Sequence, residues 1–152
     1  MSTVVFQTTD AADPALLGLL QQLDSYLSGL YPAESNYALS LEALRQAYAV
    51  FVLAFVDDQV AGCGGFVKED DQHAELKRMI VLPAFRGRAI GSRILVELES
   101  LVRAAGPHVA RLETGISQPD AIRLFEKAGY HRRGPFGNYP DDPLSVFMEK
   151  AL

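Results

Sequence analysis

The segment from residue 79 to residue 95 constrains the fold more than any other part of this chain. It runs from the apolar stretch Met79–Val81 through a basic turn, which carries Gly87 and Gly91, into an amphipathic helix. The first amides of a helix lack intrahelical acceptors and the macrodipole adds partial positive charge, so such a turn can bind an anion with its main chain. Charge and donors suited to phosphate come from three side chains, Arg86, Arg88 and Arg93. The sequence therefore predicts a strand, turn and helix that hold a pyrophosphate.

The length and charge of the chain narrow its class. With 152 residues, of which 49% are hydrophobic and 22% charged, it is expected to fold around a single core. The net charge of -5 argues against nucleic acid or an anionic membrane as partner, because both need a basic face. No apolar run reaches the roughly 18 residues of a membrane span, and the first residues lack the basic region of a secretory signal. We therefore expect a cytoplasmic protein with one domain, residues 1–152.

Cysteine and histidine usage argues against a disulfide or a metal site. Cys63 is the only cysteine and lies in an apolar run, so we expect a small buried residue rather than a nucleophile. The three histidines have no ligand-like spacing and adjoin turn residues: His73, His108 and His131. They are expected to be exposed, and no metal is predicted.

Hydrophobic periodicity and turn residues predict an α/β domain with the element order β-α-α-β-β-β-α-β-α-β-β. Strands are predicted at residues 4–6, 49–56, 60–68, 74–81, 109–114, 130–133 and 144–150. Helices are predicted to begin at Pro14, Ser40, Ile90 and Pro119. The strand before the basic turn and the strand after its helix should run parallel through a crossover, within a mixed, strongly twisted sheet.

Two motifs of this chain resemble those of a known family. Residues 86–91, Arg-Gly-Arg-Ala-Ile-Gly, look like the R/Q-x-x-G-x-G/A acyl-CoA signature of the GNAT acetyltransferase superfamily. Residues 118–130 are similar to the family's helix signature N-x-x-A-x-x-L-Y-x-x-x-G-F. The resemblance covers nearly the whole chain, is tightest from residue 75 to residue 130, and implies a GNAT-like fold.

The chain departs from these signatures at three positions. Ala89 replaces the first glycine, and we expect it to sit in the helical region, which would keep the turn. Gln118 replaces the asparagine near the pantetheine arm, and its longer amide can make the same hydrogen bonds. Phe125 replaces the tyrosine that protonates the departing thiolate, and phenylalanine cannot donate a proton.

The resemblance implies that an acetyl group passes directly from acetyl-CoA, the co-substrate, to a primary amine in a ternary complex, without a metal. The main chain of residues 79–81 would bind the pantetheine arm and the oxyanion, while their side chains are expected in the core. The resemblance implies that the following residues of the strand, the turn and the second helix signature bind acetyl-CoA: Met79, Ile80, Val81, Arg86, Gly87, Arg88, Ala89, Ile90, Gly91, Ser92, Gln118 and Phe125.

The phenylalanine at position 125 has a calculable effect on this reaction. A free thiol has a pKa of about 8.5, so its thiolate is a tolerable leaving group, and a positioned general acid contributes on the order of 10²-fold or more. We therefore expect a slower enzyme, or one in which water or a hydroxyl of Tyr130, Tyr139 or Ser117 donates the proton.

Two glutamates are candidates for the base that accepts the amine proton. Glu75, on the strand leading to the turn, resembles the catalytic glutamate of the histone-acetylating branch. Glu113, on the following strand, matches the glutamate of the branch that acetylates protein N-termini. Either would act directly or through a water, and Glu113 is favoured because it lies close to the cofactor helix. The alternative is that each is a solvated residue on an open sheet face.

The acceptor and the class of function stay open. The loop Tyr31–Tyr37 and the segment Gly137–Pro143 lie where the family shapes its acceptor pocket, and they favour a polar or cationic amine, in a small molecule or a peptide. Asp141 and Asp142 fit a simple turn equally well. A non-catalytic acyl-CoA-binding domain and a nucleotide-binding half-Rossmann unit also fit the motifs. A homodimer is compatible with the sequence, but nothing in it predicts an interface.

Overall fold

The computed structural model describes residues 3–35 and 40–152, and it confirms the predicted element order. The strands are β1 (Val4–Asp10), β2 (Val50–Val56), β3 (Gln59–Lys68), β4 (His73–Val81), β5 (Val109–Gly115), β6 (His131–Arg133) and β7 (Ser145–Ala151). The helices are α1 (Pro14–Leu30), α2 (Leu41–Gln46), α3 (Ile90–Ala105) and α4 (Pro119–Lys127), with single 3-10 turns at Ala33–Ser35 and Pro83–Phe85. The main difference from prediction is the longer β1, whose residues pair with β2 as far as Asp10.

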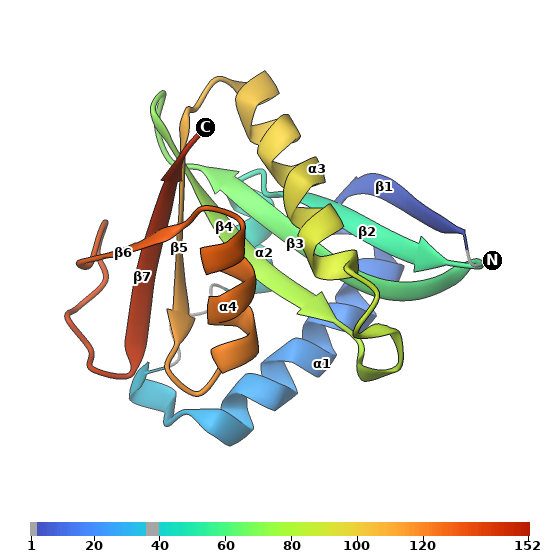
Figure 1. Cartoon of the computed structure of the whole chain (residues 1–152), viewed down its shortest axis with the longest axis horizontal. Coiled ribbons are helices and arrows are strands. Elements are labelled where there is room, and N and C mark those ends of the chain that lie inside the picture. Colours follow the sequence, from blue (N-terminus) through green and yellow to red (C-terminus); the bar gives the residue numbers. More distant parts are fainter. Residues whose placement is uncertain (1–2, 36–39) are drawn as a thin grey trace.

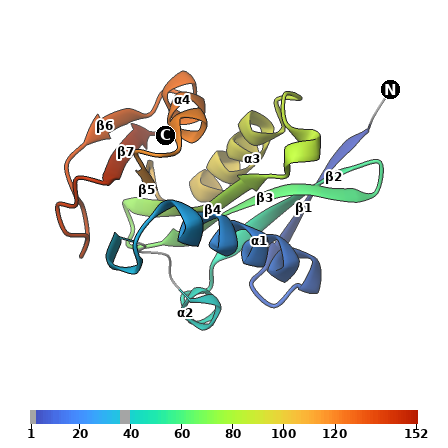
Figure 2. The same cartoon turned by 90° about the horizontal axis from the view of Figure 1, so that it is seen from below.

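Within the described residues, the strands form one sheet in the order β1-β2-β3-β4-β5-β7-β6, with α3 and α4 on one face and α1 and α2 on the other (Figures 1 and 2). Every neighbouring pair is antiparallel except β4 and β5, which are parallel as predicted. The half-Rossmann alternative is therefore wrong, because that unit needs a mostly parallel sheet.

The parallel pairing of β4 and β5 is short. It joins residues 73–75 to residues 109–111 and stops there, although β4 continues to Val81 and β5 to Gly115. Figure 1 shows the two strands diverging beyond this point, with α4 near the opening. The sheet thus has a gap in its middle, which the sequence did not reveal.

Local sequence signals explain where the helices begin. The Asp13 carboxylate accepts a hydrogen bond from the Ala15 amide, and Pro14 occupies the first helical position of α1. The Ser40 hydroxyl caps α2 by accepting from the Ala43 amide. These caps satisfy amides that lack an intrahelical partner, so they fix the start of α1 and of α2.

Two apolar cores hold the helices against the sheet. The core on the face of α3 and α4 contains the apolar stripe of α3: Ile90, Ile94, Leu95, Leu98 and Val102. The core on the opposite face contains Leu16, Leu19 and Leu20 of α1, Leu44 of α2, and Cys63. The helices therefore bury their apolar sides against the sheet.

The cysteine and two of the histidines lie as predicted. Cys63 is fully buried, and burial raises the pKa of its thiol to about 12, which makes it a poor nucleophile. His108 and His131 are exposed, but His73 is half-buried and its Nδ1 lies 2.9 Å from an Asp70 oxygen. In residues 3–35 and 40–152, no three His, Cys, Asp or Glu side chains are grouped so that they could hold a metal ion. No described helix has the length and apolar character needed to cross a membrane.

Glycines in β3 allow close packing against its neighbours. A Cβ atom on Gly62 would lie 2.5 Å from the Ile80 carbonyl oxygen, and one on Gly64 would lie 2.9 Å from Cδ1 of Leu98. Contacts this short require the backbone of β4 or the α3 side chains to move. The position of α3, and of the turn before it, therefore depends on these glycines.

We predict that Gly62→Ala lowers the free energy of unfolding by about 1–3 kcal/mol, because overpacking forces β4 to shift. Gly18→Ala is the matched control: it lies on the exposed side of α1 with nothing within 4 Å of a new Cβ. That change should raise the free energy of unfolding by about 0.5–1 kcal/mol through helix propensity. Urea unfolding measures both, and a Gly62→Ala protein as stable as the wild type would contradict the packing argument.

Candidate active site

The basic turn before α3 presents main-chain amides at the start of the helix. The first bond of the helix runs from the Arg93 amide to the Ala89 carbonyl, so the amides of residues 90–92 have no acceptor inside it. Arg86 donates from Nε to the Val81 carbonyl at 3.1 Å and ties the turn to the end of β4. Gly87 has a φ of 80°, which favours glycine. This geometry is that of an anion site.

Ala89 does not adopt the conformation that we expected. It is the N-cap of α3, with φ 58° and ψ 21°, in the left-handed region rather than the helical region. A left-handed conformation costs an L-residue about 1–2 kcal/mol. The prediction for Ala89 was therefore wrong, although the turn is kept.

A cleft of about 530 Å³ lies between this turn, β4 and α4, and we call it the turn cleft. Its walls include all the predicted cofactor residues except Arg88: Met79, Ile80, Val81, Arg86, Gly87, Ala89, Ile90, Gly91, Ser92, Gln118 and Phe125. The guanidinium of Arg88 instead lies 5.7 Å from the centroid of the Phe85 ring. The side chains of residues 79–81 pack partly against the cores but are only half-buried, so their predicted place in the core is only partly right.

A bulge in β4 shapes the strand edge beside this cleft. Arg78 has a φ of 58°, and the pairing with β3 shifts, so that Lys77 faces Gly65 whereas Ile80 faces Cys63. Beyond Glu75, the described part of β5 no longer pairs with β4. The main-chain groups of β4 that point into the gap can therefore bind an extended ligand in the manner of an added strand.

A second cavity, of about 120 Å³, lies between the diverging parts of β4 and β5, and we call it the polar cavity. Five residues line both spaces and form what we call the junction: Leu23, Met79, Gln118, Ala121 and Phe125. The polar side chains of the cavity include Tyr31, Glu75, Lys77, Glu113 and Tyr139. The structure thus brings both predicted bases into one cavity that meets the turn cleft.

The carboxyl of Glu113 has a raised pKa. Burial raises the pKa of its carboxyl from 4.5 to about 7, and the charges of Glu75 and Asp142 act in the same direction. A hydrogen bond from the Ser145 hydroxyl, at 2.9 Å, and the charge of Lys77 oppose this rise. A carboxyl with this pKa is protonated and ionised in similar amounts near neutral pH, which suits a general base.

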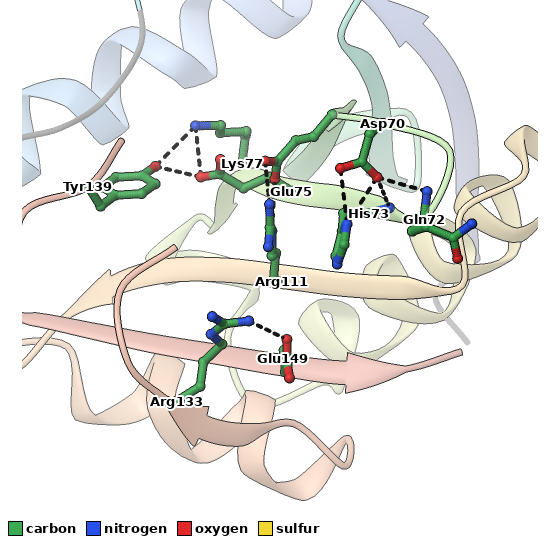
Figure 3. Close-up of polar contacts among 10 residues, drawn as sticks. Asp70, Gln72, His73, Glu75, Lys77, Arg111, Arg133, Tyr139 and Glu149 are labelled. Carbon is green, nitrogen blue, oxygen red and sulfur yellow. Dashed lines mark hydrogen bonds and ion pairs between the residues drawn. The ribbon is translucent and has the colours of Figure 1, made fainter. Parts of the chain in front are cut away.

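Glu75 has a different environment (Figure 3). Its side chain is buried, and its Oε2 atom accepts from the Tyr139 hydroxyl and lies 2.9 Å from Nζ of Lys77. The interpretation of Glu75 as a solvated residue is therefore wrong. Because two donors hold Oε2, Glu75 is fixed in place as an ion-pair partner.

The loop between β6 and β7 places Tyr139 over Glu75. Its aromatic side chains pack edge to face on β7, with centroids 5.3 Å apart for Phe136 and Tyr139 and 5.5 Å apart for Tyr139 and Phe147. Arg111 lies 4.5 Å from the centroid of Phe136 and pairs with Glu69 at 2.9 Å. The aromatic residues of this loop indicate in the sequence that it packs against the protein. The sequence does not indicate which residues of β4 and β5 they contact.

The three hydroxyls that we considered as proton donors lie in different places. The Tyr130 hydroxyl donates to the buried Glu99 at 2.8 Å, and Tyr130 lines neither cavity. Ser117 is exposed and also lines neither. Tyr139 lines the polar cavity, but its hydroxyl donates to Glu75. Burial, followed by Glu75, raises the pKa of the Tyr139 phenol.

The two segments expected to shape an acceptor pocket meet at the polar cavity. Ser35 donates from its hydroxyl to Asp142 at 2.6 Å, and Asp142 also accepts from the Leu144 amide. Asp142 therefore both makes the turn and contacts the opposite loop, whereas Asp141 is exposed. Tyr37 lies outside the described residues.

Known proteins resemble this chain over its whole length. The sequence profile of the acetyltransferase (GNAT) family matches residues 16–130. A relative from Azospirillum brasilense, named IAA acetyltransferase, is 42% identical over 153 residues, which cover 100% of both chains. A solved structure from Klebsiella pneumoniae, whose name places it among the acyl-CoA N-acyltransferases, has a TM-score of 0.84 and 32% identity and covers 99% of this chain and 98% of that one.

A more distant structure shares the fold. The PaiA N-acetyltransferase of Thermoplasma acidophilum, solved in complex with coenzyme A, has a TM-score of 0.73 over 99% of both chains. Its sequence is only 19% identical, so this likeness concerns the fold alone.

We predict that Ala89→Gly raises the free energy of unfolding by about 0.5–1 kcal/mol. Glycine removes the cost of the left-handed conformation, and part of this gain is offset by the greater freedom of glycine in the unfolded chain. The matched control is Ala121→Gly in α4, which should lower the free energy of unfolding because glycine is a poor helix former. Urea unfolding of the three proteins measures these differences, and a loss of stability in Ala89→Gly would contradict the strain at position 89.

Proposed function

This chain belongs to the GNAT family of acetyltransferases, and from that membership we propose that it transfers the acetyl group of acetyl-CoA to a primary amine by direct attack in a ternary complex. The observation that carries the proposal is the junction between the turn cleft, which suits an anionic coenzyme, and the polar cavity, which contains a carboxyl with a pKa of about 7. We propose that residues 1–152 act as one acetyltransferase domain.

The turn cleft would bind the coenzyme. Acetyl-CoA supplies the acetyl group as a thioester and carries a diphosphate, which matches the amides of residues 90–92 and the charge of Arg86. The edge of β4 beyond its bulge would hold the pantetheine arm with main-chain hydrogen bonds. Amides of residues 79–81 would stabilise the oxyanion that forms at the thioester carbonyl.

Glu113 would act as the base. The attacking amine must lose a proton as it forms the new bond, and Glu113 lines the cavity in which an acceptor would lie. Glu75 contacts Lys77 and Tyr139, and we propose that it positions these two side chains. Its charge would also raise the pKa of Glu113. This division gives one carboxyl for proton transfer and one for structure.

The acceptor would be a small polar amine or the end of a peptide. The walls of the polar cavity combine apolar groups, such as Leu27 and Leu144, with the two carboxyls. The Azospirillum relative is named for IAA, so IAA belongs in any acceptor panel for this chain.

We predict that acetyl-CoA and CoA raise the melting temperature of the protein, and that NAD does not. A ligand that binds only the native state at 100 times its Kd stabilises it by about 2.7 kcal/mol. Addition of an acceptor from a panel of amines should then release free thiol from acetyl-CoA, measured with a thiol reagent. Binding of CoA without thiol release for any amine would favour the acyl-CoA-binding alternative, which Phe125 motivates, and no stabilisation by either CoA compound would overturn the proposal.

We predict that kcat/KM for acetyl transfer rises with pH, with a midpoint near pH 7 and a plateau at higher pH, because only the ionised Glu113 accepts a proton. Glu113→Gln should lower kcat/KM by about 10²–10⁴-fold and remove this rise. The comparison variant Glu75→Gln should keep the rise but move its midpoint to lower pH, because a negative charge that raises the pKa of Glu113 is lost. If the Glu113→Gln profile keeps the wild-type midpoint, ionisation of the amine explains the rise and Glu113 is not the base.

A further inference from the structure

The junction has no proton donor at the position where the family signature has a tyrosine. Phe125 lines both cavities and packs edge to face against Tyr130, with centroids 5.7 Å apart. If the proposed function holds, the sulfur of acetyl-CoA must lie near the junction, because the thioester has to be reached from the polar cavity while the diphosphate lies in the turn cleft. A side chain that gives a proton to the departing sulfur would therefore have to lie at the junction too.

Tyr31 places a hydroxyl beside the junction. It follows the last residue of α1 with an extended backbone, φ -129° and ψ 146°, and its amide donates to the Leu27 carbonyl. Its hydroxyl donates to the side-chain oxygen of Gln118, a junction residue, at 3.3 Å. Tyr31 also lines the polar cavity. Its hydroxyl is therefore one residue away from the point where the two cavities meet.

The position of this ring depends on a glycine in β5. A Cβ atom on Gly115 would lie 1.8 Å from the Tyr31 hydroxyl oxygen, so a larger residue would displace the ring. The amide of Ser117, just beyond the strand, donates to the same hydroxyl oxygen at 3.1 Å. Main-chain groups at the end of β5 thus fix both the ring and its hydroxyl.

The hydrogen bonds of Tyr31 suit a proton donor. The Ser117 amide donates to the phenol oxygen, so this amide would stabilise the negative charge left on the oxygen after the proton is given away. The bond to Gln118 is long and joins two neutral groups, so it is easily exchanged for a bond to sulfur. Burial raises the pKa of the Tyr31 phenol, which keeps it protonated at neutral pH.

The other tyrosines near the site are less suited to this role. Tyr139 donates to the carboxylate of Glu75, a stronger acceptor than the Gln118 amide. Tyr130 donates to Glu99, which also pairs with Lys150 at 3.0 Å, and it lies outside both cavities. Tyr26 lines the turn cleft but not the polar cavity. Among the described residues, Tyr31 is the tyrosine that lines the polar cavity and donates to the neutral side chain of a junction residue.

We propose that Tyr31 is the proton donor to the sulfur of coenzyme A. As the carbon–sulfur bond breaks, the sulfur takes its electron pair, and the phenol proton of Tyr31 passes to it to give the thiol. The amine proton has gone to Glu113, so the cycle leaves a phenolate at Tyr31 and a protonated Glu113. Water then carries one proton from Glu113 to Tyr31, and both groups return to their starting state.

The first test uses binding of free CoA without any acceptor. Ultraviolet absorbance of the thiolate gives the pH at which the bound thiol ionises. A hydrogen bond from Tyr31 stabilises the thiolate, so Tyr31→Phe should raise the midpoint of this titration by about one to two pH units. Tyr139→Phe is the control and should leave the midpoint near the wild-type value, because that hydroxyl bonds to Glu75.

The second test uses the kinetics of acetyl transfer. Tyr31→Phe should lower kcat by on the order of 10²-fold with little change in the KM for acetyl-CoA. It should also remove the fall of kcat at high pH, which in the wild type reports loss of the phenol proton. Loss of a purely structural contact would change neither the thiol titration nor this limb of the pH profile.

The outcomes separate this inference from the proposed function. If wild-type protein binds CoA and transfers acetyl groups while Tyr31→Phe keeps the wild-type thiol midpoint and pH profile, Tyr31 is not the donor and only this inference falls. If the midpoint of the thiol titration shifts in Tyr139→Phe and not in Tyr31→Phe, Tyr139 is the proton donor and the inference about Tyr31 is overturned. If wild-type protein binds no CoA, the proposed function itself fails.

Discussion

The short parallel pairing between β4 and β5 is the constraint on which the site depends. It ends at Glu75 and Arg111, and beyond it each strand follows its own twist, because no hydrogen bonds hold the two together. The same divergence leaves the main chain of β4 open toward the gap and lets the turn cleft and the polar cavity meet at the junction. If β4 and β5 were paired over a longer stretch, their main-chain groups would bond to each other and the two cavities would not meet. The function proposed for this chain therefore requires that the β4–β5 pairing is short.

Two carboxyls share the polar cavity, but their environments give them different roles. Glu75 has a cation and a phenol on one oxygen, whereas Glu113 has a single hydroxyl donor and is desolvated. The charge of Glu75 adds to the effect of desolvation, so it is part of what raises the pKa of Glu113 to about 7. The role of each carboxyl follows from its neighbours and not from its position along a strand.

Features governed by local chemistry were predictable from the sequence, and those governed by distant contacts were not. The start of α1 at Asp13, the order of the elements and the basic turn all follow from neighbouring residues. The left-handed conformation of Ala89 depends on how the turn meets α3 in space. The burial of Glu75 depends on a loop that arrives from between β6 and β7. The Ser117 amide donates to the Tyr31 hydroxyl across 86 residues of sequence, and the Tyr31 ring lies against Gly115, which follows the strand predicted at residues 109–114. The sequence could therefore suggest Glu113 but not its partners.

The loops that would bind the acceptor also tune the groups that would carry out the chemistry. Ser35 bonds to Asp142, and the charge of Asp142 raises the pKa of Glu113. Tyr31 precedes Ser35 in the same connection and contacts Gln118 at the junction. A change in this connection that admits a larger acceptor would therefore also move Asp142 or Tyr31, and with them the ionisation of the base or the placement of a hydroxyl. In such an arrangement acceptor preference and the pH dependence of the rate cannot vary independently, because the same few contacts set both.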